Sequence, residues 1–282
     1  MSSVENNFVS DQDIKAKLIG EYTSQEVKKN DFPTEIIEIP SKGWFYPAHH
    51  PLASGKLEMR YMTAKDEDIL TSKNLRKQKV VLERLIQALI VTPGVYVKDV
   101  LAIDFFALML AARVLGYGKD YEVEVQDEYV DDYKQKLSID LTSLEEIDTP
   151  EVRSIFNSEF KHKNEFSYVL PKAGKLVKWK FLTYKEDLDL VNKVIAKGKN
   201  ETSMTDALKA QIVEIDGERN PERISLIVDN MLALDSKALR THIEKSKPGI
   251  DTEIKYISDI SGEEVRIDLP LTAEFFWPTT WN

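Results

Sequence analysis

The chain has 282 residues, of which 42% are hydrophobic and 30% are charged, a balance typical of a soluble protein with one or two globular domains. The formal net charge of -10 argues against a general binder of nucleic acid or anionic membrane, which needs a basic face. The absence of cysteine excludes disulfides, thiol catalysis and thiolate metal sites.

Neither a membrane segment nor a targeting segment is predicted. No apolar run approaches the roughly 20 residues that a transmembrane helix needs. The first residues, MSSVENNFVSDQD, lack the basic and apolar regions of a signal peptide. We therefore expect the protein to stay in the compartment in which it is made.

The predicted elements begin after a polar N-terminal arm. Residues 1–34 contain one weakly amphipathic stretch, DIKAKLIGEY at 13–22, and we expect a mobile arm that can order on a partner. EIIEIP at 35–40 predicts a short strand closed by proline. KLEMRYMTA at 56–64 alternates in hydrophobicity and predicts a second strand.

Three helices are predicted next. Thr63 is placed to cap the first, whose acidic opening turns favour the helix dipole. VVLERLIQALIV at 80–91 carries its hydrophobic residues on one helical face. Asp104 is expected to cap the third helix, at 105–118, whose end is marked by glycines. DYEVEVQ and QKLSIDL then alternate and predict a hairpin.

The second half of the chain repeats this order. VKWKFLTYKEDLDL at 177–190 resembles LEMRYMTAKDEDIL at 57–70, and LALDSKAL at 232–239 resembles LAIDFFAL at 101–108. The strands TEIKYI and RIDL stand where YEVEVQ and SIDL stand in the first half. We interpret this order as an internal duplication, with chance similarity as the alternative.

The predicted fold class is α+β, with two similar lobes that arise by internal duplication and pack on each other. Each lobe is expected to contain strands, about three helices and a terminal hairpin. The predicted boundaries are a mobile arm at 1–34, a first lobe at 35–148 and a second lobe at 149–282.

No sequence motif predicts an enzyme or a cofactor site. The histidines show no metal-ligand spacing such as HExxH, and His49 and His50 are interpreted as turn residues between prolines. GxSxG and GxxxxGK[ST] motifs are also absent from the sequence. We therefore predict no catalytic residue, no metal and no cofactor, although catalytic residues can converge from distant segments.

Two segments are unusually rich in aromatic residues, which anchor either a core or a protein interface. We predict the following partner-binding residues: Trp44, Phe45, Tyr46, Phe275, Phe276, Trp277 and Trp281. For Phe275 and Phe276, burial in the chain's own core is the leading alternative, whereas the terminal Trp281 points to a partner. SKGWFYP, which contains the first three, is interpreted as a structural strap and not as a reactive loop.

Charge is unevenly distributed along the chain. A basic cluster consists of Lys73, Arg76, Lys77, Lys79 and Arg84. Residues 120–151 are strongly acidic. Solvated faces are the simplest interpretation, and electrostatic docking by the basic cluster is the alternative that we keep.

Four stretches resemble the baseplate (hub) proteins of T-even-like bacteriophages: IPSKGWFYP, PLASGKLEMRYMTAKDEDILTSKNL, VDNMLALDSKALRTHI and DLPLTAEFFWP. The resemblance runs from about Ile36 to Pro278. It implies tail or baseplate morphogenesis, with other phage baseplate or tail proteins as partners and the tape-measure protein as a further candidate. Neither nucleic acid nor membrane is expected as a partner.

The sequence departs from this family in the terminal hairpins of the two lobes. Many relatives carry CxxC pairs there, resembling small zinc ribbons. The corresponding tips in this chain read DEYVDD at 127–132 and SDISGE at 258–263. Without thiolates, no zinc site of that kind is expected.

The sequence and the resemblance together predict a non-enzymatic structural or assembly protein of a contractile phage tail baseplate hub, acting by protein–protein contacts. It would be found in the host cytoplasm during assembly and, as a built-in subunit, in the virion tail baseplate. A transient assembly chaperone for the tape-measure protein, absent from the mature virion, is the alternative role. A carboxylate-dependent hydrolase is the alternative from another class, and a nucleic-acid-binding module is disfavoured by the net charge.

Overall fold

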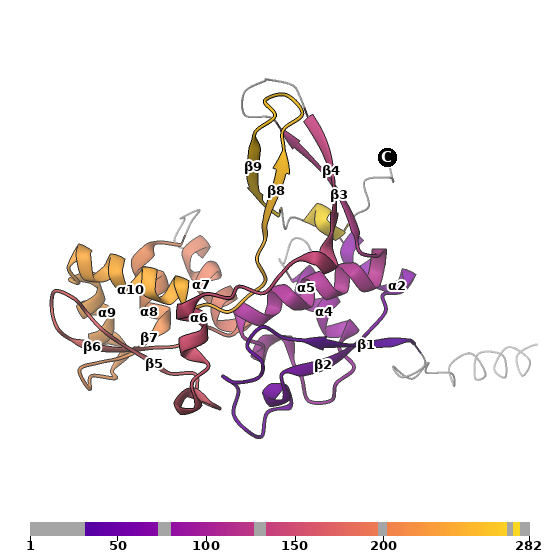
Figure 1. Cartoon of the computed structure of the whole chain (residues 1–282). Coiled ribbons are helices and arrows are strands. Elements are labelled where there is room, and N and C mark those ends of the chain that lie inside the picture. The colour runs from indigo at the N-terminus through magenta and orange to yellow at the C-terminus, as the bar shows by residue number, and fades with distance from the viewer. Residues whose placement is uncertain (1–31, 73–79, 127–133, 197–201, 270–272, 277–282) are drawn as a thin grey trace, which may run out of the picture. The chain divides into compact units, whose positions relative to one another are not determined.

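The computed structural model describes residues 32–72, 80–126, 134–196, 202–269 and 273–276 (Figure 1). The chain divides into Met1–Pro33 and Thr34–Asn282, and every element described below belongs to the second unit. The predicted N-terminal arm therefore lies almost entirely outside the described residues.

The fold class is α+β, as the sequence predicts. In the first half of the unit, residues 34–148, a hairpin precedes helices and a second hairpin. The strands are β1 (Thr34–Glu38), β2 (Lys56–Arg60), β3 (Asp120–Gln126) and β4 (Lys134–Asp140). The α-helices are α2 (Ala64–Thr71), α4 (Val81–Leu89) and α5 (Ala102–Tyr117). β1 pairs with β2 and β3 with β4, both antiparallel.

The second half starts with a connecting helix, α6 (Pro150–Ile155). Its strands are β5 (Phe166–Val169), β6 (Leu176–Trp179), β7 (Ile212–Ile215), β8 (Glu253–Ile257) and β9 (Glu264–Asp268). Its further α-helices are α7 (Tyr184–Ala196), α8 (Met204–Gln211), α9 (Pro221–Asp229) and α10 (Ala233–Lys245). β5, β6 and β7 form one antiparallel sheet, and β8 pairs with β9. None of the described helices combines the length and the apolar character needed to cross a bilayer.

Most predicted elements are confirmed, and one predicted cap is wrong. Thr63 is the N-cap of α2 and forms a capping box with Asp66. α5, however, begins at Ala102 after the N-cap Leu101, so Asp104 lies inside the first turn. The Asp104 side chain does not cap this helix but accepts hydrogen bonds from the segment at 41–46. α6 and β7 were not predicted, because such short segments carry almost no periodicity.

The helix starts that follow β2 and β6 are built from the same contacts. In the first half, the Thr63 amide donates to Asp66 Oδ2 over 2.8 Å, and Arg60 binds the same carboxylate with two guanidinium nitrogens. In the second half, the Thr183 amide donates to Glu186 Oε2 over 3.0 Å, and the Lys180 ammonium binds that carboxylate. A threonine, an acid three residues later and a cation before it thus recur in both halves.

A second matched pair of contacts fixes the last long helix of each half to a hairpin turn. Asp104 in α5 is fully buried and accepts a hydrogen bond from the Ser41 amide over 2.8 Å. Asp235 in α10 is also fully buried and accepts from the Lys172 and Ala173 amides over 2.7 and 3.0 Å. These matched contacts agree with the internal duplication, which itself stays a prediction.

Buried side chains of both halves form one continuous hydrophobic cluster. Phe45, from the loop between β1 and β2, is a buried member of this cluster. Its ring lies 5.2 to 5.5 Å from the rings of Phe156, Phe166 and Phe181, all in the second half. The core therefore continues across the boundary at 148, and the two predicted lobes share it.

The two terminal hairpins stand side by side (Figure 1). Gln135 in β4 joins them, because its side-chain amide donates to the Ile257 carbonyl and its oxygen accepts from the Asp259 amide. The tips predicted at 127–132 lie outside the described residues, whereas the β8–β9 turn closes through the Ser258 side chain and the backbone. In the second hairpin, backbone pairing therefore continues up to the turn.

The buried carboxyl of Asp104 gives a pH-dependent prediction. Burial raises its pKa to about 6, while hydrogen bonds from Ser41 and Tyr46 lower it. An acid whose pKa is higher in the folded chain keeps its proton longer when folded, so its contribution to stability falls as the pH rises from about 4 to about 6. Asp104→Asn cannot titrate. We expect its destabilisation to be largest near pH 4 and to shrink by up to about 3 kcal/mol towards neutral pH.

Urea unfolding of the natural chain and of Asp104→Asn at several pH values measures this difference. A destabilisation that grows as the pH rises would contradict the raised pKa and would mean that the hydrogen bonds outweigh burial.

Candidate functional site

The segment between β1 and β2 is a tightly folded strap, which we define as residues 41–55. Gly43 has φ +74°, and a Cβ there would lie 2.5 Å from the backbone oxygens of Leu52 and Ala53. Gly55 has φ +76° and approaches the Lys42 backbone in the same way. Both positions require glycine, because any side chain would meet backbone atoms. The strap is therefore held in one conformation by its sequence.

His50 occupies a turn position in this strap, as predicted. Its Nδ1 accepts a hydrogen bond from the Leu52 amide over 3.1 Å, and it caps a short 3-10 helix, Pro51–Ser54. Its ring stacks on Tyr46 at a centroid distance of 5.0 Å. Burial lowers its pKa, which favours the neutral ring that accepts this hydrogen bond.

The strap aromatics that we predicted to bind a partner are largely core residues. Phe45 and Tyr46 are buried. The Tyr46 hydroxyl donates to Asp104 Oδ2 over 2.7 Å and accepts from the Leu101 amide over 2.9 Å. Tyr46 therefore holds the start of α5, whereas Phe45 packs on aromatic rings of the second half. Because both side chains are buried within the chain, their assignment as partner-binding residues is corrected. Trp44 is only partly buried, with its ring edge on Phe156 and the Lys161 ammonium over its face.

The terminal aromatics that the structure describes also belong to the core. Phe275 and Phe276 are each 1% exposed. Phe275 lies against Tyr121 at 5.1 Å, and its carbonyl accepts a hydrogen bond from Arg113 Nε over 3.0 Å. The core alternative is therefore correct for this pair, and their partner-binding assignment is corrected. Trp277 and Trp281 lie outside the described residues, so their assignment stays a prediction.

The predicted basic cluster can be placed only in part. Arg84 lies on α4 with an exposed side chain. The other members lie outside the described residues: Lys73, Arg76, Lys77 and Lys79. Electrostatic docking by this cluster stays a prediction.

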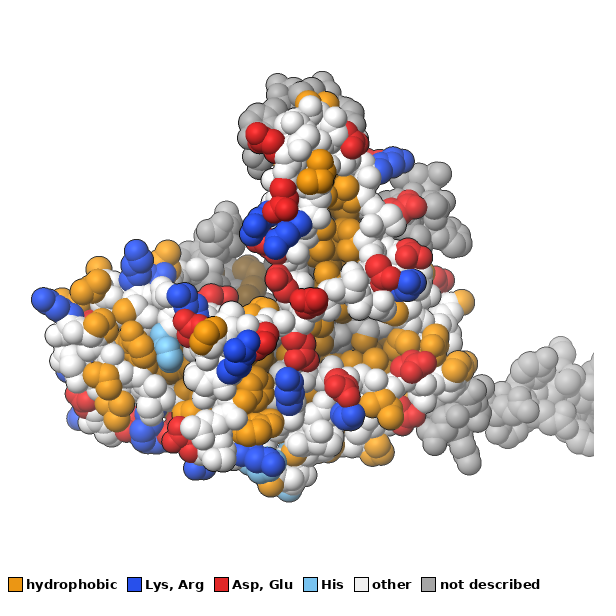
Figure 2. Space-filling model, viewed as in Figure 1, with side chains coloured by type: hydrophobic (Ala, Val, Ile, Leu, Met, Phe, Trp, Pro, Cys, Tyr) orange, Lys and Arg blue, Asp and Glu red, His pale blue; other side chains and the backbone are white. Residues whose placement is uncertain are grey.

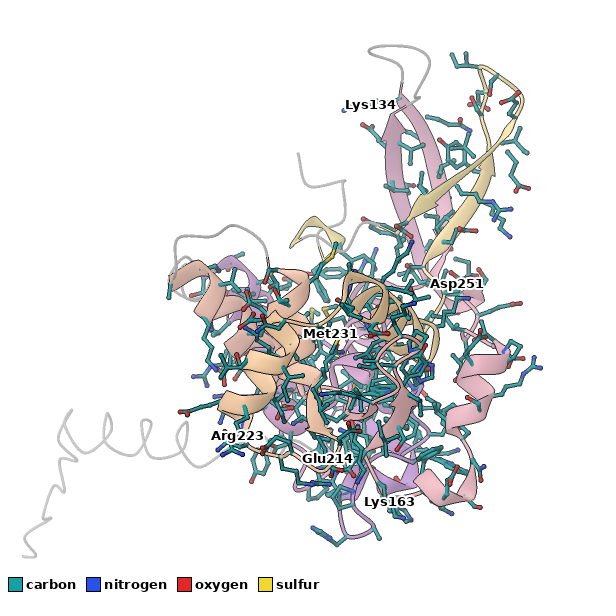
Figure 3. The ribbon with its side chains drawn as sticks, turned by 90° about the vertical axis from the view of Figure 1, so that its left-hand side faces the viewer. Lys134, Lys163, Glu214, Arg223, Met231 and Asp251 are labelled. Atoms are coloured by element: carbon teal, nitrogen blue, oxygen red, sulfur yellow. The ribbon has the colours of Figure 1, made fainter. Side chains whose placement is uncertain are left out.

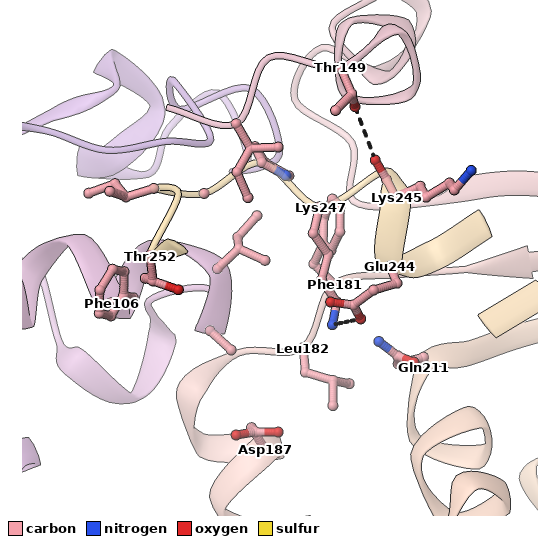
Figure 4. Close-up of a pocket in the computed structure, with 16 residues that line it drawn as sticks. Phe106, Thr149, Phe181, Leu182, Asp187, Gln211, Glu244, Lys245, Lys247 and Thr252 are labelled. Atoms are coloured by element: carbon pink, nitrogen blue, oxygen red, sulfur yellow. Dashed lines mark hydrogen bonds and ion pairs between the residues drawn. The ribbon is translucent and has the colours of Figure 1, made fainter. Parts of the chain in front are cut away.

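A groove of about 490 Å³ lies where the start of α5, the start of α7 and the end of α10 meet (Figure 4). Phe106 and Leu182 give it apolar walls. Its polar groups include Asp187, Glu244 and Lys247, and Lys247 binds Glu244 over 2.6 Å. Partial desolvation raises the pKa of Asp187, while the charge of Lys247 lowers it. The Asp187 side chain is nevertheless exposed, so the groove is open to water at this carboxylate.

The groove is lined by carboxylates and by two lysines, Lys245 and Lys247, and its described residues show no recognisable metal centre. Within the described ranges, no group of three or more His, Asp or Glu side chains could hold a metal ion. The chemistry available there is binding of a cationic or amide-bearing group, or acid–base work by Asp187 with Glu244.

Exposed apolar side chains gather where α9 leads into α10. We define the α10 surface as the exposed Leu226, Leu232 and Leu234, which are 64, 52 and 59% exposed, together with Met231, which is half-buried and packs against the core. Asp235 ties the start of α10 to the β5–β6 turn, and the exposed Val169 and Leu176 stand at the strand ends on either side of this turn. α9 and α10 lie on the left-hand side of the molecule in Figure 1, and Figure 2 shows hydrophobic side chains on that side. Figure 3 turns this side towards the viewer and labels Met231 near the middle of the picture.

Sequence reasoning missed the α10 surface, although it singled out the stretch that contains Met231, Leu232 and Leu234. LALDSKAL was interpreted as a counterpart of LAIDFFAL and as part of a family resemblance, and not as an exposed surface. The sequence does show that the apolar start of one helix, LAIDFFAL, recurs as LALDSKAL in the second half. It does not show whether the second copy is buried by another element. Exposure of such residues depends on tertiary packing, which hydrophobicity alone does not give.

Comparisons with protein-family models, with curated proteins and with solved structures found no match for this chain.

The burial of the terminal pair predicts a loss of stability on truncation. Removing a buried phenylalanine ring costs roughly 3–5 kcal/mol, so Phe275→Ala should lower the free energy of unfolding by about that amount. Deletion of residues 275–282 should do so as well, because it removes both rings and the acceptor of Arg113. Urea unfolding of both variants tests this.

Trp281→Ala is the matched comparison, because it truncates an aromatic residue of the same terminal segment. If Trp281 contacts a partner, this variant should keep the stability of the natural chain and lose assembly. Phe275→Ala with unchanged stability would show that the terminal aromatics do not belong to the core.

Proposed function

We propose that this chain is a structural or assembly protein of a contractile phage tail baseplate hub and that it works through protein–protein contacts and not through catalysis. The resemblance of IPSKGWFYP and the other three stretches to baseplate hub proteins supports the biological setting. The α10 surface is the observation that supports the mode of action.

The composition of the α10 surface is typical of a docking site. Its leucines lie on neighbouring helices and are each more than half exposed. Burial of such apolar side chains by a partner is favourable, and exposed apolar patches mark interaction sites. The patch sits on a rigid support, because buried Asp235 fixes the start of α10 through two backbone amides. A rigid apolar patch can bind a partner without an ordering cost in this chain.

Virion content tests the setting of this proposal and its two roles. Quantitative mass spectrometry of purified particles of the phage that encodes this chain should find it at a fixed, low copy number if it is a built-in hub subunit. Presence in infected cells, bound to tail proteins but absent from virions, would indicate the assembly chaperone, with the tape-measure protein as the first partner to test. Absence of the chain from both particles and tail-protein complexes would contradict the proposal.

The groove keeps a hydrolase as the second candidate function. It brings Asp187, whose pKa is raised by partial burial, into the same cavity as Glu244. Two carboxylates of this kind can divide acid and base roles. If this function holds, cell-wall hydrolysis by the purified chain should be abolished by Asp187→Asn and by Glu244→Gln. No hydrolysis by the natural chain would rule out this cell-wall activity.

A further inference from the structure

The two halves are joined by a reciprocal pair of backbone hydrogen bonds between two helix starts. The Ala102 amide, at the start of α5, donates to the Leu182 carbonyl over 2.8 Å. The Tyr184 amide, at the start of α7, donates to the Val100 carbonyl over 2.7 Å. Leu101 and Thr183 therefore face each other as an isolated antiparallel bridge.

This contact uses groups that a helix start leaves free. The first amides of a helix have no acceptor within the helix, and Ala102 and Tyr184 are both first residues of their helices. Each helix start satisfies the amide of the other, and Leu101 is thereby reduced to 3% exposure. The ring of Phe105 packs on that of Tyr184 at 4.1 Å beside the bridge.

Each half also contains a segment that aligns with the segment that the other half places in this bridge. In the aligned stretches LEMRYMTA and VKWKFLTY, Met62 and Ala64 correspond to Leu182 and Tyr184. In LAIDFFAL and LALDSKAL, Ala233 corresponds to Ala102, and Met231 precedes its stretch as Val100 does. The chain therefore has two helix starts of the α5 type, those of α5 and α10, and two of the α7 type, those of α7 and α2. The internal bridge uses the starts of α5 and α7, and we call the starts of α10 and α2 the unused copies.

The unused copies are open. Among the described residues, no hydrogen-bond partner is seen for the carbonyls of Met62 and Met231 or for the amides of Ala64 and Ala233. Leu232, the counterpart of the buried Leu101, is 52% exposed. The α10 surface is thus the uncovered equivalent of a surface that is covered in the first half.

The unused copies lie on different helices of the unit. Met62 and Ala64 stand at the start of α2, and Met231 and Ala233 stand at the start of α10 (Figure 1). The start of α2 corresponds to one strand of the bridge and the start of α10 to the other. The α2 start of one molecule can therefore pair with the α10 start of another. A contact of this type is heterologous and leaves a free end on each partner, which leads to rings or open chains.

We propose that the α10 surface binds the start of α2 of a second copy of this chain, in a head-to-tail contact that repeats the internal bridge. The Ala233 amide of one copy donates to the Met62 carbonyl of the next, and the Ala64 amide of that copy donates to the Met231 carbonyl of the first. Leu232 and Leu234 are covered by the arriving helix start.

The contact between copies is weaker than the internal one. The strap that carries Phe45 and Tyr46 strengthens the internal contact, and the β5–β6 turn of the second half is much shorter than this strap. Ala64 and Ser236 also stand where the internal contact has the rings of Tyr184 and Phe105. Association between copies is therefore reversible and depends on concentration.

Sedimentation velocity of the full chain over a range of concentrations tests the proposal. The weight-average sedimentation coefficient of the natural chain should rise with concentration. Leu232→Asp with Leu234→Asp should abolish the rise, and it leaves folding intact because both side chains are exposed and acids are favoured in the first turn of a helix. Ile257→Asp, at an exposed position on β8, is the matched control and should self-associate as the natural chain does.

Proline variants test the backbone hydrogen bonds themselves. Proline is tolerated at the first position of a helix, and the extended conformations of Thr63 and Leu232 suit a residue that precedes proline. Ala64→Pro and Ala233→Pro each remove one amide that has no use within the monomer, so each should weaken self-association about tenfold without lowering the melting temperature. Ala102→Pro removes the equivalent amide of the internal bridge and should lower the melting temperature.

Complementation distinguishes a head-to-tail contact from any other mode of association. A variant with Leu232→Asp and Leu234→Asp keeps its α2 start, whereas a variant with Met62→Asp and Ala64→Pro keeps its α10 surface. Each alone should be monomeric, and an equimolar mixture should form a dimer and nothing larger. A natural chain that stays monomeric at all concentrations overturns the proposal, and so does self-association with no dimer in the mixture.

This inference rests on the proposed function because both use the α10 surface, but different experimental results would contradict each of them. A monomeric chain found at fixed copy number in virions removes only the self-association. A chain that self-associates through α10 but is absent from phage particles and tail complexes removes only the baseplate function.

Discussion

The rest of the structure depends on the reciprocal hydrogen bonds between the starts of α5 and α7. They join the Ala102 amide to Leu182 and the Tyr184 amide to Val100, so two helix starts that would each leave a donor unpaired satisfy one another. The strap reinforces the bridge, because the Tyr46 hydroxyl binds both the Leu101 amide and the buried Asp104. The core then continues from Phe45 into the second half.

This arrangement changes the meaning of the aromatic segments. Phe45, Tyr46, Phe275 and Phe276 serve the fold, and among the described residues the leucines around α10 form the surface that we propose for a partner. The proposed function and the inferred self-association both depend on this difference, in which the aromatic residues are buried and the α10 leucines are exposed. A hub or assembly protein needs rigid surfaces that neighbours can read, and here the rigid elements are the ones fixed by buried Asp104 and Asp235.

Much of the fold could be predicted from the sequence because its signals are local. Alternation predicted β2 and the first terminal hairpin, a short apolar run closed by proline predicted β1, and the repeated order predicted the second hairpin. Thr63 with its following acids predicted the start of α2. The role of Asp104 could not be predicted, since an acid in the first turn of a helix is normally explained by the dipole, and its true partners are the distant Ser41 and Tyr46. The α10 surface was missed for the same reason, because burial of Leu101 and exposure of Leu232 are set by contacts far along the chain.

Amide hydrogen exchange of the full chain at low and high protein concentration tests the central claim most directly, because it reports on the individual donors. The account predicts that the Ala102 and Tyr184 amides are protected at both concentrations. The Ala64 and Ala233 amides should exchange rapidly in dilute protein and slow down together as the concentration rises. Fast exchange at Ala102 and Tyr184, or unchanged fast exchange at Ala64 and Ala233 in associated protein, would contradict it.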